Sequence, residues 1–398
     1  MNASLARQGR VHRPSPALPP RSWLGILGGG QLGRMFTQAA QALGYRVCVL
    51  DPDEASPAGA VAERHLRAGY QDEAALDELA RLCPAVSTEF ENVPAASLER
   101  LAALGVVSPS AAAVAVAQDR IDEKAFIRQC GIATAPYAVV RAAADLQQLP
   151  DDLFPGILKA ARLGYDGKGQ ARVASRQEAL QAFEGFGGVA CVLERQLSLS
   201  AELSVLLARG FDGAIRIWPI AQNVHRAGIL HTSQVPAVLP AAACARAQEA
   251  AGVLAERLDY VGVLCVEFFL LDDGQVLVNE MAPRPHNSGH WTLDASVTSQ
   301  FEQQARVLAG LPLGDTHQLA PALMLNLLGD VWFDSASSNQ PREPDWGALL
   351  ADPRAKLHLY GKAQPRRARK MGHVTFVADT AAAAQAACAR AATLLGIA

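Results

Sequence analysis

The sequence predicts a mixed α/β and α+β protein with an N-terminal doubly wound parallel sheet, a small lid and a C-terminal antiparallel-sheet domain. Three observations carry this prediction. Short apolar strands alternate with helical segments up to about residue 117, the pattern of parallel βαβ units. Glycines and lysines then interrupt a compact strand-and-helix block over 163–170. Two hairpin-like segments follow, over 202–220 and 261–284.

Each expected element has a local signal. Residues 23–28 are a short apolar run that ends in glycines, and residues 31–44 show helical apolar spacing closed by Gly44. The other expected elements are, in order, strand 45–51, helix 72–82, strand 84–90, segments 97–105 and 106–110 that continue the alternation, helix 119–131, strand 154–160, strand edge and helix 172–187, strand 191–197, two strands joined at 211–213, helix 241–259, hairpin 261–284, a small segment near 355–378 and a terminal Ala-rich helix.

These elements set the expected domain boundaries. Residues 1–21 carry four arginines, four prolines and no acid, which predicts a flexible tail. We expect a Rossmann-like domain over 22–117, a lid over 118–196, and a C-terminal domain over 197–398 that includes a small basic segment.

Composition excludes several classes of protein. The chain has 398 residues, a net charge of −3, 50% hydrophobic residues and 19% charged residues, which excludes intrinsic disorder and offers no global attraction to nucleic acid or anionic membrane. Its 7 cysteines form no C-x-x-C pair, which argues against a disulfide framework or structural zinc and favours a reducing cytoplasm. No stretch approaches the roughly 18 apolar residues of a membrane span.

The hairpin over 261–284 places two glutamates face to face. Its Asp273-Gly274 dipeptide favours a two-residue type I′ turn, which puts Glu267 directly opposite Glu280. Like charges with Cβ atoms about 4.5–5.5 Å apart repel, so a cation between them is expected among apolar neighbours. Oxygen ligands favour Mg²⁺. The alternative is two solvated carboxylates on an exposed face.

A glycine motif follows the first strand. Gly28-x-Gly30-x-x-Gly33 opens a helix and Asp51 ends the next strand, which is the form of a dinucleotide fingerprint. This pattern supports NAD, a phosphorylated substrate or simply a tight strand-to-helix turn.

Lys159 lies in an apolar strand before the loop 163–170. A lysine beside a glycine-rich loop suits a polyphosphate that must be enclosed, and Tyr165, Asp166 and Lys168 would close over the reacting centre. The pattern is not a P-loop, and the alternative is an exposed turn.

Two further segments concentrate polar residues. Residues 282–291 hold Arg284, two histidines and an asparagine. The two histidines could bind zinc together only on one face of a helix, and Pro285 and Gly289 oppose a helix there. A polar loop that binds substrate is therefore favoured. Residues 354–373 hold seven Lys or Arg and no acid, which indicates a local anion site or a solvated basic face.

Together these segments resemble the ATP-grasp superfamily and, within it, the N5-carboxyaminoimidazole ribonucleotide synthase family. The resemblance covers about residues 23–378. It rests on GILGGGQLGRM (25–35), STEFENVP (87–94), GYDGKGQ (164–170), NVHRAGI (223–229), NEMAPRPHNSGHW (279–291) and GKAQPRRARKMGH (361–373). Family members often carry Arg where this chain has Lys168, which keeps the charge but loses the bidentate fork.

The resemblance implies a cytoplasmic homodimer, a carbon–nitrogen ligase of purine biosynthesis that binds ATP and Mg²⁺ between lid and C-terminal domain. The implied reaction carboxylates 5-aminoimidazole ribonucleotide with bicarbonate through carboxyphosphate, giving the N-carboxy nucleotide, ADP and phosphate. It implies no nucleic-acid or membrane partner.

The family's motif positions assign roles to residues of this chain. The implied ATP-binding residues are Arg120, Lys159, Gly164, Tyr165, Asp166, Gly167, Lys168, Gly169, Gln170, Glu194, Arg195, Gln196, Leu197, Glu202, His225, Asn279 and Glu280. The implied metal ligands are Glu267 and Glu280, and the implied catalytic residues are Tyr165, Asp166, Lys168 and Arg284. The implied substrate-binding residues are Gly30, Gln31, Leu32, Glu89, Asn287, His290, Lys362, Arg369 and Lys370.

Other functions compete with this one. A formate-dependent glycinamide ribonucleotide transformylase would use the same ATP chemistry, but residues 279–291 favour the carboxylase. An NAD-dependent oxidoreductase is supported only by the glycine motif and Asp51. A non-enzymatic binding module would show no ATP turnover.

Overall fold

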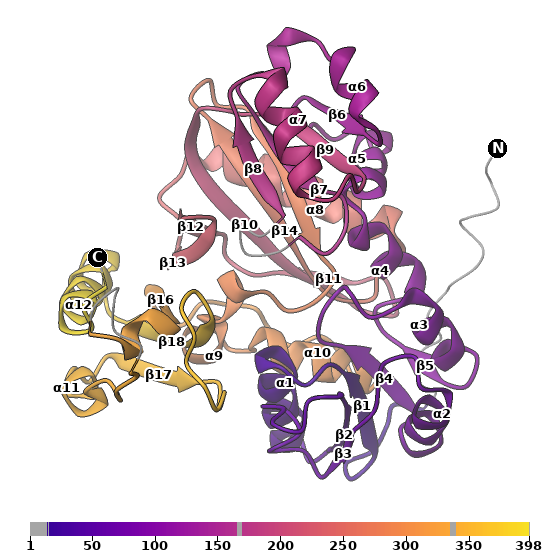
Figure 1. Cartoon of the computed structure of the whole chain (residues 1–398). Coiled ribbons are helices and arrows are strands. Elements are labelled where there is room, and N and C mark those ends of the chain that lie inside the picture. The colour runs from indigo at the N-terminus through magenta and orange to yellow at the C-terminus, as the bar shows by residue number, and fades with distance from the viewer. Residues whose placement is uncertain (1–13, 15, 165–168, 335–339, 398) are drawn as a thin grey trace.

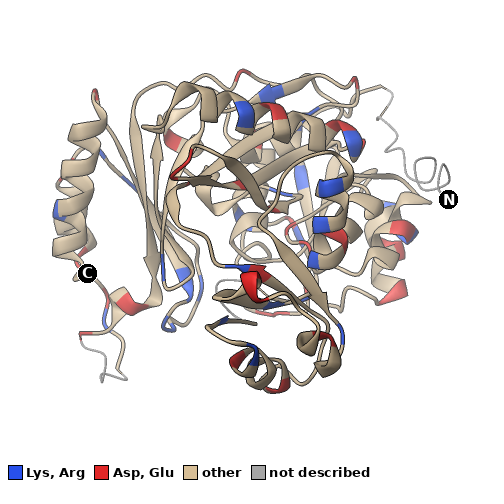
Figure 2. Cartoon of the chain, turned by 90° about the horizontal axis from the view of Figure 1, so that it is seen from above, with Lys and Arg blue, Asp and Glu red and all other residues tan. Residues whose placement is uncertain are grey.

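Three sheets and the helices packed on them form the protein (Figure 1). The computed structural model describes residues 14, 16–164, 169–334 and 340–397. Within these residues, no helix combines the length and the apolar character that crossing a bilayer requires. Figure 2 shows Lys and Arg interspersed with Asp and Glu over most elements.

The N-terminal sheet is parallel, as predicted. Its strand order, β3-β2-β1-β4-β5, reverses direction at β1 in the manner of a doubly wound sheet. Gly44, at φ +84°, ends the first helix as expected. The elements are β1 (Trp23–Leu27), α1 (Gln31–Ala42), β2 (Arg46–Leu50), β3 (Arg64–Leu66), α2 (Glu73–Leu82), β4 (Ala85–Thr88), α3 (Ala95–Ala102), β5 (Val106–Val107) and α4 (Ala111–Gln118).

The second sheet is antiparallel and has the strand order β6-β9-β7-β8. Its two helices bury Leu146, Ala179 and Phe183 against the strands. The elements are α5 (Arg120–Gln129), β6 (Tyr137–Val140), α6 (Ala143–Gln147), η2 (Asp151–Leu153), β7 (Gly156–Ala160), β8 (Gln170–Val173), α7 (Arg176–Gly185) and β9 (Cys191–Arg195).

The third sheet has nine strands along the path β15-β14-β10-β12-β13-β16-β18-β17, with β11 paired to β10. Its strand pairs are antiparallel, as predicted. The elements are β10 (Leu199–Arg209), β11 (Ile215–Ile217), β12 (Ala221–Arg226), β13 (Ile229–Val235), α8 (Ala241–Arg257), β14 (Gly262–Leu271), β15 (Val276–Ala282), η3 (Asn287–Gly289), α9 (Thr292–Ala295), α10 (Gln300–Leu308), β16 (Ala322–Leu328), η4 (Gly329–Trp332), α11 (Trp346–Leu350), β17 (Ala355–Leu359), β18 (Lys370–Val377) and α12 (Ala381–Leu394).

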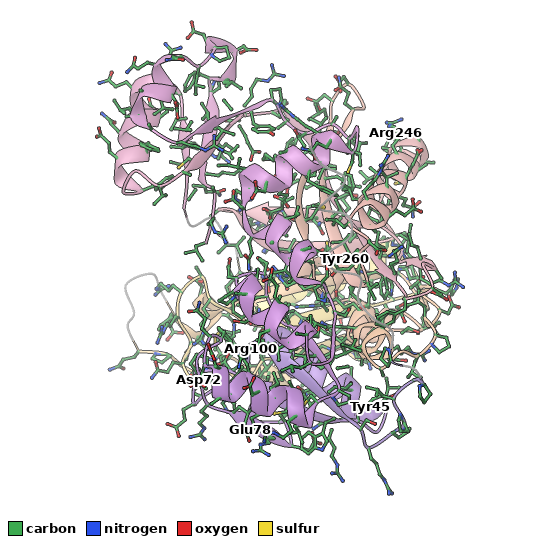
Figure 3. The ribbon with its side chains drawn as sticks, turned by 90° about the vertical axis from the view of Figure 1, so that its right-hand side faces the viewer. Tyr45, Asp72, Glu78, Arg100, Arg246 and Tyr260 are labelled. Atoms are coloured by element: carbon green, nitrogen blue, oxygen red, sulfur yellow. The ribbon has the colours of Figure 1, made fainter. Side chains whose placement is uncertain are left out.

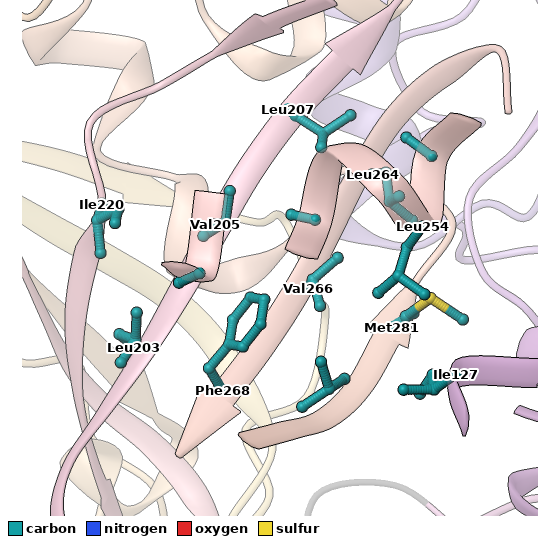
Figure 4. Close-up of a cluster of buried hydrophobic side chains, with 14 of the residues drawn as sticks. Ile127, Leu203, Val205, Leu207, Ile220, Leu254, Leu264, Val266, Phe268 and Met281 are labelled. Atoms are coloured by element: carbon teal, nitrogen blue, oxygen red, sulfur yellow. The ribbon is translucent and has the colours of Figure 1, made fainter. Parts of the chain in front are cut away.

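The largest apolar core of this sheet lies under α8. Leu203, Val205 and Leu207 project from alternate positions of β10, and Val266 and Phe268 do so from β14 (Figure 4). The alanines of α8 let the helix lie close to these strands, so their burial accounts for the Ala-rich sequence.

The predicted type I′ turn of the β14–β15 hairpin is wrong, although the predicted opposition of Glu267 and Glu280 is confirmed. The Leu271 N–H donates to Gln275 O at 2.9 Å, which leaves a three-residue loop closed by Gly274 at φ +83°. That loop shifts the register by one residue, and a β-bulge between Glu267 and Phe268 shifts it back. Arg246 of α8, labelled in Figure 3, donates a hydrogen bond of 2.7 Å to Gly274 O in this turn.

The core beside the parallel sheet includes a helix from much later in the sequence. Phe301, Ala305 and Leu308 of α10 pack with Leu32 and Phe36 of α1, and all five are buried. Because α10 also contacts β10 and β14, this packing connects the parallel domain to the nine-stranded sheet and fixes the orientation of α1 relative to that sheet. The predicted domain boundaries stay a prediction.

Candidate active site

A buried cluster of two lysines and one glutamate lies between α5, β7 and β9. Arg120 and Lys124 are four residues apart on α5 and therefore share a face. Lys124 Nζ and Lys159 Nζ each lie 3.1 Å from one oxygen of Glu194, and the three side chains are at most 10% exposed. The single carboxylate leaves this cluster with an excess of positive charge.

Burial and charge act in opposite directions in this cluster. Burial lowers the pKa of Lys159, and Glu194 only partly offsets the shift. Burial also opposes ionisation of Glu194, yet the charges of Lys159 and Lys124 hold its pKa below the usual range. Glu194 is therefore ionised, and both of its oxygens are paired with lysines.

The opposed glutamates of the hairpin face these cations. Arg120 Nη1 lies 2.6 Å from Glu280 Oε2, and Arg120 and Lys159 hold the pKa of Glu280 below its usual value against the effect of burial. Burial and the Glu280 charge raise the pKa of Glu267 to about 7. Glu267 Oε1 is buried and has no hydrogen-bond partner among the described residues. A buried, unpartnered carboxylate oxygen opposite a second carboxylate fits a hard cation such as Mg²⁺.

The extra residue of the bulge, Asn279, connects the hairpin to the lysines. Lys124 Nζ donates to Asn279 O at 3.3 Å, and Lys159 Nζ lies 3.5 Å from Asn279 Oδ1. The bulge thus both restores the register of the glutamates and turns a carbonyl and an amide toward the cation cluster.

The neighbouring strands add an acid and a histidine. Glu202 of β10 and His225 of β12 form an ion pair through Nδ1. Burial lowers the pKa of His225, but the hydrogen bond to Glu202 and the charge of Glu267 outweigh burial and raise it overall. The N–H groups of Arg195 and Gln196 donate to Pro136 O and Pro155 O, both at 2.9 Å.

Known protein families match successive parts of the chain. Models of the ribonucleotide synthetase preATP-grasp domain, the ATP-grasp domain and the phosphoribosylaminoimidazole carboxylase C-terminal domain match residues 22–118, 125–301 and 322–387. N5-carboxyaminoimidazole ribonucleotide synthase of Brucella melitensis is 46% identical over 364 residues, 91% of this chain and 98% of that protein. The Bacillus subtilis protein of the same name is 41% identical over 359 residues, 90% and 92% of the two chains.

The chain belongs to the N5-carboxyaminoimidazole ribonucleotide synthase family.

Solved structures of the family agree with this fold. The Staphylococcus aureus enzyme complexed with ADP matches with a TM-score of 0.87 at 33% identity and covers 94% of this chain and 98% of that chain. The Aspergillus clavatus enzyme in complex with ADP and 5-aminoimidazole ribonucleotide matches with a TM-score of 0.85 at 30% identity and covers 94% and 99%. The predicted ATP-grasp architecture is confirmed.

Two carboxylates of this chain occupy the space beside the glycine turn that suggested NAD. Asp51 accepts the Gly29 N–H at 2.7 Å, and Glu89 accepts the N–H groups of Gly30 and Leu32 at the start of α1. Side chains at Gly29 and Gly30 would collide with these acids. The glycines therefore allow Asp51 and Glu89 to approach, and Glu89 takes the place at the helix N-terminus that a phosphate would need.

Arg284 is held by an acid that the sequence analysis missed. Its Nε and Nη2 lie 2.5 and 3.2 Å from the two oxygens of Glu91, which comes from the N-terminal domain. The segment STEFENVP contains Glu91, so its signal was present in the motif. Lys124, also missed, is signalled by its spacing from Arg120.

The loop after β15 places its polar side chains at different depths. Asn287 is 7% exposed, and neither end of its amide has a hydrogen-bond partner among the described residues. His290 is 1% exposed and lies in the interior, with Nδ1 3.0 Å from Gln300 Nε2 and its ring against His373. His286, which precedes both, has Nε2 3.7 Å from Glu267 Oε1.

A further histidine cluster does not form a metal site. Ligand atoms of Asp294, His358 and His373 lie within 4.8 Å of one another. The two imidazoles, however, stack at 4.6 Å with planes only 14° apart. Lone pairs in parallel ring planes do not converge on one ion, so the cluster is a packed hydrogen-bonded unit.

The basic segment lies beside the start of α1. A Cβ at Gly361 would lie 3.2 Å from Arg34 Nη1, which shows how closely the two approach. Lys362 Nζ donates to Lys370 O at 2.6 Å, and Arg369 Nη1 donates to Gln364 O at 3.0 Å. Lys370 is close enough to His286 to contribute to the lowering of its pKa, behind burial and Arg284.

The loop 163–170 is described only at its two ends. Gly164 O accepts from Arg120 Nη2 at 3.3 Å, and Gly169 O accepts from the Ala160 N–H at 2.8 Å. Gln170 begins β8 and pairs with Lys159. The predictions for Tyr165, Asp166, Gly167 and Lys168 lie outside the described residues. The assigned role of each site residue stays a prediction.

Proposed function

We propose that this protein is an ATP-dependent carbon–nitrogen ligase that carboxylates 5-aminoimidazole ribonucleotide in purine biosynthesis, with bicarbonate as the carboxyl source and Mg²⁺ as the metal. The family match over about nine-tenths of the chain supports the activity. The observation that carries the chemistry is the opposed pair of Glu267 and Glu280 facing the buried cations of α5 and β7.

The arrangement suits a nucleoside triphosphate. Arg120 and Lys159 offer cationic donors to phosphate oxygens, and Glu267 and Glu280 would hold Mg²⁺. Mg²⁺, when bound, supplies charge neutralisation at the transferred phosphoryl group. Glu202 and His225 lie on the neighbouring strands, where a ribose or base would meet them. These charges are already in place and stabilise the transition state without rearranging, which is the main source of catalysis in phosphoryl transfer.

The second half of the reaction needs an anion site next to this one. Bicarbonate oxygen attacks the γ-phosphorus, ADP leaves, and carboxyphosphate forms. The exocyclic amine of the nucleotide then takes the carboxyl carbon, loses a proton, and phosphate leaves. Arg284 lies close enough to Glu280, and Lys370 to Glu267, for their charges to interact, and together with Asn287 they would bind the carboxyl group and the ribose phosphate.

We further propose a homodimer in the cytoplasm. The seven free cysteines support a reducing compartment, and the resemblance to the family supports the dimer. Sedimentation at several concentrations tests the assembly, and a monomer at every concentration would contradict it.

ADP release from ATP, Mg²⁺ and bicarbonate tests the activity. We expect strong stimulation by 5-aminoimidazole ribonucleotide in the wild type and in Glu249→Gln, an exposed control on α8. Stimulation should be lost in Glu280→Gln, which removes one ligand charge without a change of shape. An ATP-binding wild type that the nucleotide does not stimulate would overturn the substrate assignment.

A further inference from the structure

Lys124 of α5 is the more deeply buried of the two lysines in the cluster with Glu194. Its side chain is 1% exposed, whereas that of Lys159 is 10% exposed. The Lys124 ammonium group lies 3.1 Å from Glu194 Oε1, donates to Asn279 O at 3.3 Å and lies 5.8 Å from the centre of the Tyr137 ring. Protein groups therefore surround this ammonium group, and Lys124 acts on a bound ligand through its neighbours rather than by contact.

The two oxygens of Glu194 are divided between the two lysines. Oε2 accepts a hydrogen bond from Lys159 Nζ at 3.1 Å. Oε1 accepts no hydrogen bond among the described residues, so the charge of Lys124 at 3.1 Å is what stabilises it. Two positive charges and one negative charge leave the cluster with a surplus of one positive charge. This surplus is available to an anion that reaches Lys159, the more exposed of the two lysines.

Lys124 also decides what happens to Glu194 when an anion binds Lys159. A phosphate oxygen that pairs with the Lys159 ammonium draws this charge away from Glu194, and a buried carboxylate without a partner is strongly unfavourable. With Lys124 in place, Glu194 keeps one cation at 3.1 Å, so the phosphate binds without leaving the carboxylate unpaired. Without Lys124, Glu194 and Lys159 form a neutral pair, and a phosphate must compete with Glu194 for the ammonium group.

We propose that Lys124 is a positioning residue of the nucleotide site, which pairs with Glu194 and so keeps Lys159 available to the phosphates of ATP. The proposal deepens the proposed function and rests on it for one step, the assignment of the phosphates to Lys159. If Lys124 only filled space, its loss would be harmful whatever residue stands at position 194. A role through charge depends instead on the charge at that position.

Binding of a non-hydrolysable ATP analogue with Mg²⁺, measured by isothermal titration calorimetry of the full-length protein, tests the proposal. Lys124→Met removes the charge and keeps an unbranched side chain, so it should raise the dissociation constant at least about tenfold. Arg128→Met is the matched control, because Arg128 is an exposed cation one turn later on α5 and lies over the same Tyr137 ring at 4.0 Å. This control should keep the wild-type dissociation constant.

The double variant with Lys124→Met and Glu194→Gln separates charge from structure. It removes one charge of each sign, so Lys159 is left with the same surplus of one positive charge as in the wild type. The dissociation constant should return to within about threefold of the wild-type value. Unchanged binding in Lys124→Met would overturn the proposal. Binding in the double variant as weak as in Lys124→Met would overturn it too, because the side chain would then matter for structure rather than for charge.

The binding test is independent of the carboxylation assay, because neither bicarbonate nor 5-aminoimidazole ribonucleotide is present. A wild-type protein that binds the ATP analogue but is not stimulated by the nucleotide would contradict the proposed function, and the three variants would still decide the role of Lys124. A wild-type protein that does not bind the ATP analogue would overturn both proposals.

Discussion

Replacing Glu194 by Gln should destabilise the protein strongly. The substitution keeps the shape of the side chain but removes the carboxylate whose oxygens lie 3.1 Å from Lys124 Nζ and Lys159 Nζ. The three side chains are 3%, 1% and 10% exposed, so water cannot replace the lost charge. Breaking a buried ion pair from one side costs about 3–5 kcal/mol, and here two cations are left unpaired and close together.

Urea unfolding followed by far-UV circular dichroism, together with hydrogen exchange at β9, measures this loss. Glu54→Gln is the matched control, because the Glu54 side chain is 81% exposed in its ion pair with Arg67 and should contribute no measurable stability. Adding Lys124→Met to Glu194→Gln should restore part of the loss by removing one unpaired charge. A Glu194→Gln protein as stable as the control would refute the reasoning that this cluster is dry and electrostatically coupled.

The same variant should show a characteristic pH dependence. Burial lowers the pKa of Lys159 in the folded protein below its ordinary value, and removing Glu194 lowers it further. Between the folded and unfolded pKa values the unfolded chain binds more protons, so stability rises with pH. The penalty of Glu194→Gln should therefore shrink as the pH is raised from 7 toward 10, and a constant penalty would contradict the assignment to unpaired lysine charge.

Three other predictions follow from the N-terminal turn and the Arg284 clamp. Gly30→Ala should lower the midpoint of thermal unfolding by forcing a Cβ onto Glu89 Oε1, whereas Gly69→Ala, with no atom within 4 Å of its Cβ, should not. Burial raises the pKa of Glu89 to about 7, so the protonated Glu89 contributes to the free energy of unfolding below pH 4.5, and this contribution is lost as the pH rises through 7. The free energy of unfolding, measured by urea titration, should therefore fall between pH 5 and pH 8, and Glu89→Gln should remove up to about 3 kcal/mol of that fall. Arg284→Lys should lower kcat/KM for the nucleotide at least about tenfold, because a single ammonium cannot replace the two bonds to Glu91, and an unchanged value would show that the fork is not needed.

Much of the site was readable from local sequence patterns. The opposition of Glu267 and Glu280 depends only on pairing within one hairpin, between residues close together in the chain. Even so, the sequence predicted the right register from the wrong turn. A three-residue loop and a bulge at Asn279 shift the pairing in opposite directions, and neither is visible in apolar alternation.

The family and its reaction also follow from the sequence, because the motifs are long and occur in order. They lie where backbone groups approach ligands or one another, and such positions accept few residue types. The glycine turn shows the limit of this argument. The same three glycines fit a dinucleotide phosphate or a buried carboxylate equally well, and only the structure places Glu89 in that space.

Residues close together in the chain set the alternation of elements and the shared face of Arg120 and Lys124, and they bring Glu267 and Glu280 into one hairpin. The tertiary structure alone decided the bond between Arg284 and Glu91, which are 193 residues apart, and the contact of Ser204 with Ser288 across 84 residues. Local propensity carries no information about such pairs, because the free energy that forms them comes from burial of whole faces, and the polar partners meet only after those faces have packed.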